Sequence, residues 1–298
     1  MGRFVFLFAV CSLAAFAQTP EEGIRQLWNT QFVQQRPPAK KTAAKGTSKP
    51  VAKPPQYKSV ATVKPAKAAS PSDTLLGMTL WRLRRPRPAD DPNSRLLILE
   101  DTSQATTELV PERLEADSAV NEGDKIRLTV EVPRTGYLYI IDREQYADGT
   151  TSAPYLIYPN HKTRTGDNAV AAGRVVEIPD QRDTPNHFTL KRSRADQTAE
   201  LLSLLVTKEP LEGLKIGAQP LKISEEQFAE WEKMYGVQAE RFELTGGAGA
   251  AYTEAEKNAG GSSDTRLTQD DPYPQTLYRV SADPGKALML NLPVKIKR

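Results

Sequence analysis

The sequence predicts a mainly β protein, an antiparallel β-sandwich (Ig-like or related) with one or two short helices, preceded by a disordered linker. Residues Lys125–Val132 alternate strictly between polar and apolar side chains, as a strand of such a sheet does. Short apolar runs recur at intervals of roughly ten to twenty residues, which favours a sandwich with Greek-key or meander connections. A Pro-, Ala- and Lys-rich stretch precedes these runs and has almost nothing to bury.

Residues 1–17 have the pattern of a secretory signal peptide. Arg3 supplies positive charge, residues 4–10 are apolar, and Ala15-Phe16-Ala17 forms a small-x-small cleavage site. A membrane anchor would need an apolar run of about 20 residues, which is much longer than this one. We therefore expect a mature protein that is secreted or periplasmic, with no transmembrane span after signal removal.

The only cysteine, Cys11, lies within the segment that is predicted to be removed. A lipid attached to it is not favoured, because Val10 stands where a lipidation site needs a small residue. The mature chain is therefore expected to form no disulfide, no thiolate zinc site and no cysteine nucleophile.

Residues 18–35 form a short amphipathic segment. Ile24, Trp28 and Phe32 lie at helical spacing. Two interpretations stay open: an ordinary fraying segment, or a peptide that docks on its own body or on a partner.

Residues 36–72 are expected to form a basic, extended linker with seven prolines and no acidic residue. Its nine basic residues are Arg36, Lys40, Lys41, Lys45, Lys49, Lys53, Lys58, Lys64 and Lys67. The chain carries a net charge of +3, so residues 73–298 carry about −6. The linker predicts contact with an envelope protein or an anionic envelope polymer. A solvated spacer, or a tail that folds back on the acidic body, stays open. Nucleic acid is not expected as a partner, because an exported protein is separated from the nucleic acid of the cell.

Residues 73–298 are expected to form the β-sandwich domain. In Lys125–Val132 the apolar residues fall on one face and the polar ones on the other, which predicts one face on a core and one in water. Residues 137–141 are apolar on both faces, which predicts a central strand. The other expected strands are 80–83, 96–99, 155–158, 174–178, 187–191, 201–206, 276–280 and 287–296.

One helix is well marked in the sequence. Ser224 is a capping residue with Gln227 three positions on, Phe228 and Trp231 share a face, and Gly236 ends the run. Residues 246–263 are rich in small residues and are expected to form a mobile loop, with a short helix over 253–258.

Four segments form a recognisable series: EGDKIRLTVEVPRTGYLYIIDREQYADGT (122–150), PYLIYP (154–159), GRVVEIP (173–179) and the chain from HFTLKRS to LLVTKEP (187–210). Together they resemble a family of bacterial secreted domains known as domain of unknown function 4384, with a family-like core of about residues 110–210. The resemblance implies a small β-sandwich in an envelope or signalling context. It implies no settled activity and offers no catalytic residues to transfer.

The acidic run Asp142, Glu144 and Asp148 before Gly149 is similar to a calcium loop, in which oxygen ligands alternate before a glycine. The spacing is wrong and no distal glutamate follows, and Asp-Gly is also the usual tip of a tight hairpin. We therefore expect a hairpin tip, and assign no metal or cofactor site.

The two histidines, His161 and His187, lack the spacing of a metal site and are expected at the surface. No nucleophile elbow accompanies them, so no catalytic residue is assigned. Four strand tyrosines could form a sugar-binding face, although core packing is the commoner role of such residues: Tyr137, Tyr139, Tyr155 and Tyr158.

The sequence therefore predicts an exported, envelope-associated, non-enzymatic binding or scaffolding module of unknown partner, which it contacts through sandwich loops or an exposed sheet edge. The alternative is a carbohydrate-active or other hydrolase with unrecognised carboxylates. Two carboxylates about 5 to 9.5 Å apart in a deep cleft would favour the enzyme.

Overall fold

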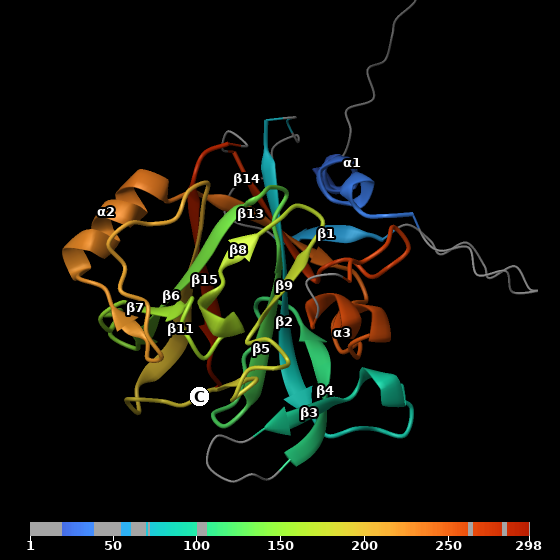
Figure 1. The fold of residues 1–298 in the computed structure, drawn as a ribbon, viewed down its shortest axis with the longest axis horizontal. Helices are drawn as coiled ribbons and strands as arrows, with labels where there is room; N and C mark the ends of the chain where they lie inside the picture. The colour runs from blue at the N-terminus through green and yellow to red at the C-terminus, as the bar shows by residue number, and fades with distance from the viewer. Residues whose placement is uncertain are drawn as a thin grey trace, which may run out of the picture.

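The computed structural model describes residues 20–38, 55–60, 70, 72–99, 106–261, 265–281 and 285–297. The predicted signal peptide lies outside these residues. The described strands form two sheets in which all neighbouring strands run antiparallel (Figure 1).

The first sheet has nine strands built around the long strand β2 (Thr74–Arg84). In spatial order the main path is β1 (Tyr57–Val60), β13 (Ala239–Leu244), β14 (Thr276–Val280), β2, β4 (Thr106–Leu114) and β3 (Leu96–Leu99). Strand β5 (Lys125–Glu131) pairs with β2 and with the short strands β9 (Val175–Ile178) and β10 (Phe188–Thr189).

The second sheet has six strands. Its order is β12 (Leu221–Lys222), β7 (Tyr155–Tyr158), β6 (Gly136–Tyr146), β11 (Gln197–Thr207) and β15 (Leu288–Lys295), and β8 (Ala169–Val170) also pairs with β6. The central pair, β6 and β11, runs in register from Tyr137 opposite Thr207 to Tyr146 opposite Gln197, with one irregularity near Ala199.

The main hydrophobic core lies between the two sheets. Alternate residues of each strand supply it: Leu128 and Val130 from β5, Leu138 and Ile140 from β6, and Leu204 from β11. Burial of these side chains from both sheets is the arrangement of a sandwich, so the predicted fold class is confirmed.

Helices cover the outer faces of both sheets, on opposite sides of the molecule (Figure 1). Helix α2 (Glu225–Tyr235) packs Phe228 and Trp231 on the second sheet, and Ser224 caps it through Gln227 N–H as predicted. Helix α1 (Pro20–Gln31) packs on the first sheet, and α3 (Glu254–Gly260) lies beside β9. Three single 3-10 turns complete the elements: η1 (Val33–Gln35), η2 (Pro92–Ser94) and η3 (Arg164–Gly166). None of the described helices is long and apolar enough to cross a membrane.

The amphipathic segment docks on its own body. Ile24, Trp28 and Phe32 are at most 1% exposed and contact a cluster of residues from β2, β13 and β14. The rings of Trp28 and Phe32 stack with centroids 4.0 Å apart. Of the two interpretations left open by the sequence, docking in cis is the one that this structure has.

Two parts of the predicted linker are ordered parts of the body. Arg36 is buried and its Nη2 donates to both carboxylate oxygens of Glu131 at 2.9 Å. Residues Tyr57–Val60 form β1, and the Tyr57 hydroxyl donates to the Pro274 carbonyl. The buried Tyr57 ring and the buried Arg36–Glu131 ion pair hold these residues on the body. The Pro-, Ala- and Lys-rich composition of the linker as a whole does not reveal these two contacts. Residues 39–54 and 61–69 of the predicted linker lie outside the described residues.

The predicted water-facing side of β5 is in fact buried, so that expectation is wrong. Arg127, Thr129 and Glu131 are all less than 9% exposed. The neighbouring strands β9 and β2 supply partners: Arg127 pairs with Glu177, and Trp81 Nε1 donates to the Thr129 hydroxyl. Ion pairs and hydrogen bonds replace water on this face, which therefore keeps a polar sequence.

Strands β4 and β13 were not expected, because both carry several charges. Glu112 of β4 accepts from Arg82 and Arg84 of the neighbouring strand β2, and Glu243 of β13 accepts from the Thr276 hydroxyl. The expected loop 246–263 contains the buried Tyr252 and the short helix α3, which begins with a capping box at Thr253.

Candidate functional site

Two acidic side chains continue the apolar rows that fill the space between the sheets. Along β6, Asp142 follows Leu138 and Ile140 at the same alternate spacing, and along β11, Glu200 precedes Leu202 and Leu204 in the same way. Successive side chains of a strand point to opposite faces, so both acids point toward the space between the sheets.

The register brings three acids together where β6 and β11 run past the apolar core. Glu200 lies directly opposite Glu144, and Asp142 lies opposite Leu202, which makes Asp142 a diagonal neighbour of Glu200. Like charges placed directly opposite each other in a sheet destabilise it. Local strand pairing therefore gives no reason for this arrangement.

Glu144 has partners that the other two acids lack. Its Oε2 accepts from the Tyr146 hydroxyl at 2.6 Å and from the Ser193 hydroxyl. Glu200 Oε1 accepts from Gln197 Nε2 at 2.9 Å. By contrast, Asp142 Oδ1 and Glu200 Oε2 are buried and accept no hydrogen bond from the donors of the described residues. The Asp142 and Glu200 side chains lie within hydrogen-bonding reach of each other, so a proton on either one can join them.

The protonation of the two acids is shifted in the same direction. Burial, followed by the nearby charge of Glu144, raises the pKa of Asp142 to about 7. Burial, followed by the charge of Asp142, raises the pKa of Glu200 to about 8. In both cases the two largest causes are burial and the charge of a neighbouring acid. The pair therefore exchanges protons near neutral pH as one coupled unit.

These acids line a pocket of about 230 Å³ between the sheets, which we call the acid-floored pocket. Its exposed residues, Thr189 and Pro220, mark the rim. The remaining lining is Ile126, Leu128, Asp142, Ile157, Asn160, Phe188, Leu190, Glu200, Leu202 and Val294. The side-chain amide of Asn160 is hydrogen-bonded within the local turn: Oδ1 accepts from Lys162 N–H, and Nδ2 donates to the Ile157 carbonyl. Small-molecule sites are typically lined by apolar side chains, with a few polar groups that fix the orientation of the ligand. A pocket with apolar walls and two carboxyl groups fits this description.

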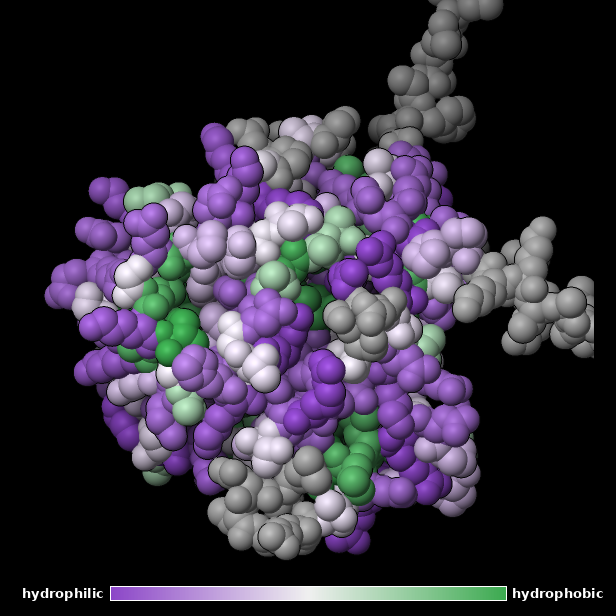
Figure 2. Space-filling model, viewed as in Figure 1, coloured by the Kyte–Doolittle hydropathy of each residue, from purple (hydrophilic) through white to green (hydrophobic). Residues whose placement is uncertain are grey.

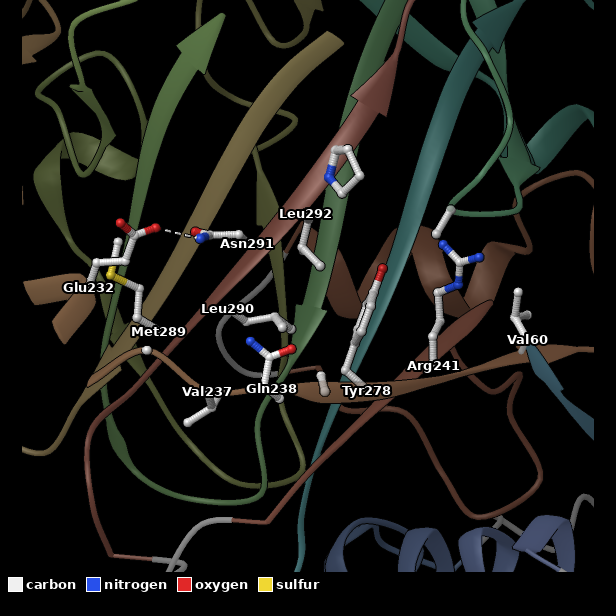
Figure 3. Close-up of a pocket in the computed structure, with 14 residues that line it drawn as sticks. Val60, Glu232, Val237, Gln238, Arg241, Tyr278, Met289, Leu290, Asn291 and Leu292 are labelled. Carbon is white, nitrogen blue, oxygen red and sulfur yellow. Dashed lines mark hydrogen bonds between the residues drawn. The ribbon is translucent and has the colours of Figure 1, made fainter. Parts of the chain in front are cut away.

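A second hollow, of about 560 Å³, lies along the outer edge of β15 (Figure 3). Three of its polar side chains are engaged: Asn291 Nδ2 donates to Glu232 Oε1 at 2.8 Å, and the Arg241 guanidinium binds Asp117. Other segments occupy the two ends of this edge, since Val237 N–H donates to the Met289 carbonyl and Val120 N–H to the Lys295 carbonyl.

Pro293 lies between these two contacts, at the alternation that faces outward, and has no N–H to donate. This edge is therefore poorly suited to accept a further strand. Contact with a partner through an exposed sheet edge, one of the two surfaces expected from the sequence, finds no support at β15.

A third hollow, of about 650 Å³, is lined by charges of both signs. Arg164 reaches Asp167, and Arg182 binds Asp180 at 3.0 Å. The backbone of Arg164 and Thr165 is left-handed, with φ of 47° and 55°, and Arg164 N–H donates to Asp183 Oδ1. The positive and negative side chains neutralise one another, so this hollow has no net charge that would attract a charged ligand.

The acidic run considered for calcium is divided in the structure. Asp142 and Glu144 lie on β6, while Asp148 is exposed at the hairpin tip, where its Oδ1 accepts from Thr150 N–H and the Thr150 hydroxyl. Gly149 has φ of +85°, as a tight turn requires. Within the described part of the chain, no group of three or more His, Cys, Asp or Glu residues is placed to hold a metal ion.

The other candidate residues are also dispersed. His161 is exposed, whereas His187 is buried beside Lys125, contrary to the expected surface position. Among the four tyrosines, Tyr139 faces α2 and Tyr158 lies in the core between the sheets, and only Tyr155 is well exposed. The four rings therefore do not form one sugar-binding face.

Glu200 was missed at the sequence level. A signal was present, because both acids stand at positions where the alternation of their strands calls for an apolar residue. That signal becomes visible only when the two strands are known to be neighbours.

The comparisons with known proteins agree with the resemblance noted in the sequence. Residues 119–203 match the family described as domain of unknown function (DUF4384). This segment contains Asp142, Glu144 and Glu200 and most of the acid-floored pocket. No curated protein and no solved structure matches the chain.

Proposed function

We propose that this protein is an exported, envelope-associated binding module without catalytic activity, and that the acid-floored pocket is its ligand site. The observation that carries the proposal is the Asp142–Glu200 pair, two half-buried acids whose oxygens Asp142 Oδ1 and Glu200 Oε2 are buried beside an apolar pocket and accept no hydrogen bond from the described residues. Burying such groups costs free energy that the fold does not recover by itself. A local conflict of this kind is expected where a site is kept for a ligand.

The surface supports a pocket rather than a broad contact area. On the face shown in Figure 2 most residues are hydrophilic, and hydrophobic residues form small, separated patches. Large partner-binding surfaces usually show a wide continuous apolar area. Selective recognition is therefore better served by the pocket than by that face.

Export is proposed from the sequence of residues 1–17, with cleavage after Ala17. The lysine-rich composition of residues 39–54 would then favour anionic envelope material. Cell fractionation followed by mass determination of the exported protein tests this part. A protein that keeps residues 1–17 or stays in the cytoplasm contradicts it.

The hydrolase alternative is favoured by one observation, because two acids that share a proton can act as general acid and general base. The two side chains lie within hydrogen-bonding reach, whereas the carboxyl groups of glycoside hydrolases lie about 5 to 9.5 Å apart. A hydrolase would therefore have to use another substrate class. Turnover of peptide or ester substrates that is lost in Asp142→Asn would favour it over a binding module.

Co-sedimentation of the purified protein with cell-envelope fractions, across a salt series, tests the binding function. Three variants accompany the wild type: Asp142→Asn in the pocket, Asp148→Asn at the hairpin tip as its matched control, and a chain with Lys40, Lys41, Lys45, Lys49 and Lys53 changed to Gln. The lysine variant leaves α1 and β1 in place, because both are packed on the body.

We expect binding that persists at high salt and in the lysine variant but falls in Asp142→Asn and not in Asp148→Asn. Binding that disappears with salt or with the lysines, and is indifferent to Asp142, would make the linker the only anchor. That result would leave the pocket without a role.

A further inference from the structure

We infer that the acid-floored pocket binds a primary ammonium group carried on a short, unbranched apolar stem. This inference rests on the proposed function, since it names the ligand class for the same pocket. It is built from the contacts of the two acids, from the walls of the pocket and from its size.

The charge of the pocket sets the polarity of the ligand. Two buried acids of the first sheet each have an arginine: Glu131 has Arg36 at 2.9 Å, and Glu177 has Arg127 at 3.1 Å. The half-buried Asp142 and Glu200 lie beside each other instead, and their buried oxygens Asp142 Oδ1 and Glu200 Oε2 accept no hydrogen bond from the described residues. Once the pair loses a proton the pocket is negatively charged, and an anionic ligand is disfavoured.

The donor geometry favours ammonium over a metal ion. Asp142 Oδ1 and Glu200 Oε2 are two buried acceptors from adjacent strands, and an ammonium group has three N–H donors that can reach both. Calcium takes six to eight oxygen ligands, and the amide oxygen of Asn160 is already used by Lys162 N–H. Two free carboxylate oxygens are too few for such an ion.

The walls and volume describe the rest of the ligand. Side chains of both sheets line the pocket, among them Leu128, Leu202 and Val294, and none of these can hydrogen-bond. A volume of about 230 Å³ holds roughly seven groups of the size of a water molecule, at ~30 Å³ each. An amine with a stem of about five carbons matches that number.

Such a group occurs in free alkylamines and in the lysine side chain of a peptide. Isothermal titration calorimetry with n-pentylamine hydrochloride and with a blocked Ala-Lys-Ala peptide separates these two sources. Pentanoate and 1-pentanol have the same stem with a negative or an uncharged head group, and serve as matched controls for the charge.

At pH 8 we expect saturable binding of at least one of the two amines, with at least tenfold weaker binding of pentanoate and pentanol. Asp142→Asn is expected to weaken amine binding at least tenfold, whereas Asp148→Asn leaves it unchanged. Glu200→Gln is the second pocket variant, so that a folding defect of one substitution does not decide the result. Binding is also expected to weaken tenfold or more at pH 5, where both acids are protonated.

Failure of both amines to bind the folded wild type, or equal binding of the amine and of pentanol, overturns the inference. If envelope binding still depends on Asp142 in that case, the proposed function stands and only the ligand class is wrong. If neither assay depends on Asp142, the pocket is not a binding site and both proposals fail.

Discussion

The molecule buries acidic groups in two regions, and it treats them differently. On the outer face of the first sheet, Glu131 pairs with Arg36 and Glu177 pairs with Arg127, with all four side chains at most 7% exposed. At the end of the space between the sheets, Asp142 and Glu200 are half-buried, and their buried oxygens Asp142 Oδ1 and Glu200 Oε2 accept no hydrogen bond from the described residues. The first region is compensated by opposite charge and the second is not.

The difference separates structural from functional burial of charge. A buried ion pair holds its two elements together, because removal of one partner leaves the other charge uncompensated. Arg36 thereby connects the N-terminal segment to β5, whereas Arg127 reinforces the pairing of β5 with its neighbour β9 by opposite charge. The acid pair connects only two strands that already share an extensive ladder of register partners. The acid pair therefore adds no connection between elements beyond the pairing of β6 with β11.

The largest expected effect comes from breaking a compensated pair. Arg127→Met leaves Glu177 buried without its cation, although the Tyr252 hydroxyl still donates to it at 2.7 Å. We expect a loss of about 3–5 kcal/mol in the free energy of unfolding, measured by urea denaturation. Adding Glu177→Gln should recover part of that loss, because no unpaired charge is then buried.

Arg182→Met is the matched control for this prediction. Arg182 also pairs with an acid, Asp180, but its side chain is 73% exposed. The control should change stability by less than about 1 kcal/mol. Equal effects of the two substitutions would contradict the view that burial makes the Arg127 pair structural.

The acid pair should respond with the opposite sign. Asp142→Asn keeps the shape of the side chain and removes a carboxylate that burial disfavours. We expect the free energy of unfolding at pH 8 to rise by about 1–3 kcal/mol, which for a chain of this size is a rise of several degrees in the melting temperature. A loss of stability instead would show that the pair is structural, like the pairs on the outer face.

The pH dependence sharpens the same contrast. In the unfolded chain both acids lose their protons near pH 4, whereas in the folded state the pKa of Asp142 is raised to about 7 and that of Glu200 to about 8. The folded state therefore holds more protons between these values, and its stability falls as pH rises from about 4 to about 8. The slope contributed by the pair is at most about 1.4 kcal/mol per pH unit for each proton.

Urea denaturation at pH 5, 6, 7 and 8 measures this slope. Other buried acids with raised pKa values, such as Glu177 and Glu243, add to it, so the informative quantity is the difference between the wild type and Asp142→Asn/Glu200→Gln. The double variant should have the flatter profile. Parallel profiles would mean that the two acids titrate alike in the folded and the unfolded states.

The sequence predicts most of the fold because apolar alternation marks strands that have a hydrophobic face. Residues 96–99, 155–158 and 276–280 were predicted with the bounds that the structure has. The same rule failed on β4, β13 and the outer face of β5, where charged residues are buried in pairs. A single sequence does not say which charges meet, so a paired charge and a solvated one look the same.

The candidate site shows the same limit. Asp142 was singled out, but with Asp148, its neighbour in sequence, rather than with Glu200, its neighbour in space. The pairing of β6 with β11 brings together residues 58 positions apart, and only that register reveals a pair of acids. The N-terminal segment is a related case, because Trp28 and Phe32 left docking open as one of two interpretations and did not indicate the surface that receives them.

The smallest expected effect concerns the acids that the sequence grouped as a calcium loop. Because Asp148 is exposed and engaged by Thr150, while Asp142 points between the sheets, the described ligands do not converge on one ion. The melting temperature in millimolar calcium and in chelator should agree within about 1 °C, since a tightly bound ion would stabilise the folded state by mass action. Asp148→Ala should leave the free energy of unfolding nearly unchanged, because the side chain is exposed. A rise of several degrees in calcium that Asp148→Ala abolishes would place an ion at the hairpin. The acid pair would then have a counterion after all, and its contrast with the compensated face would disappear.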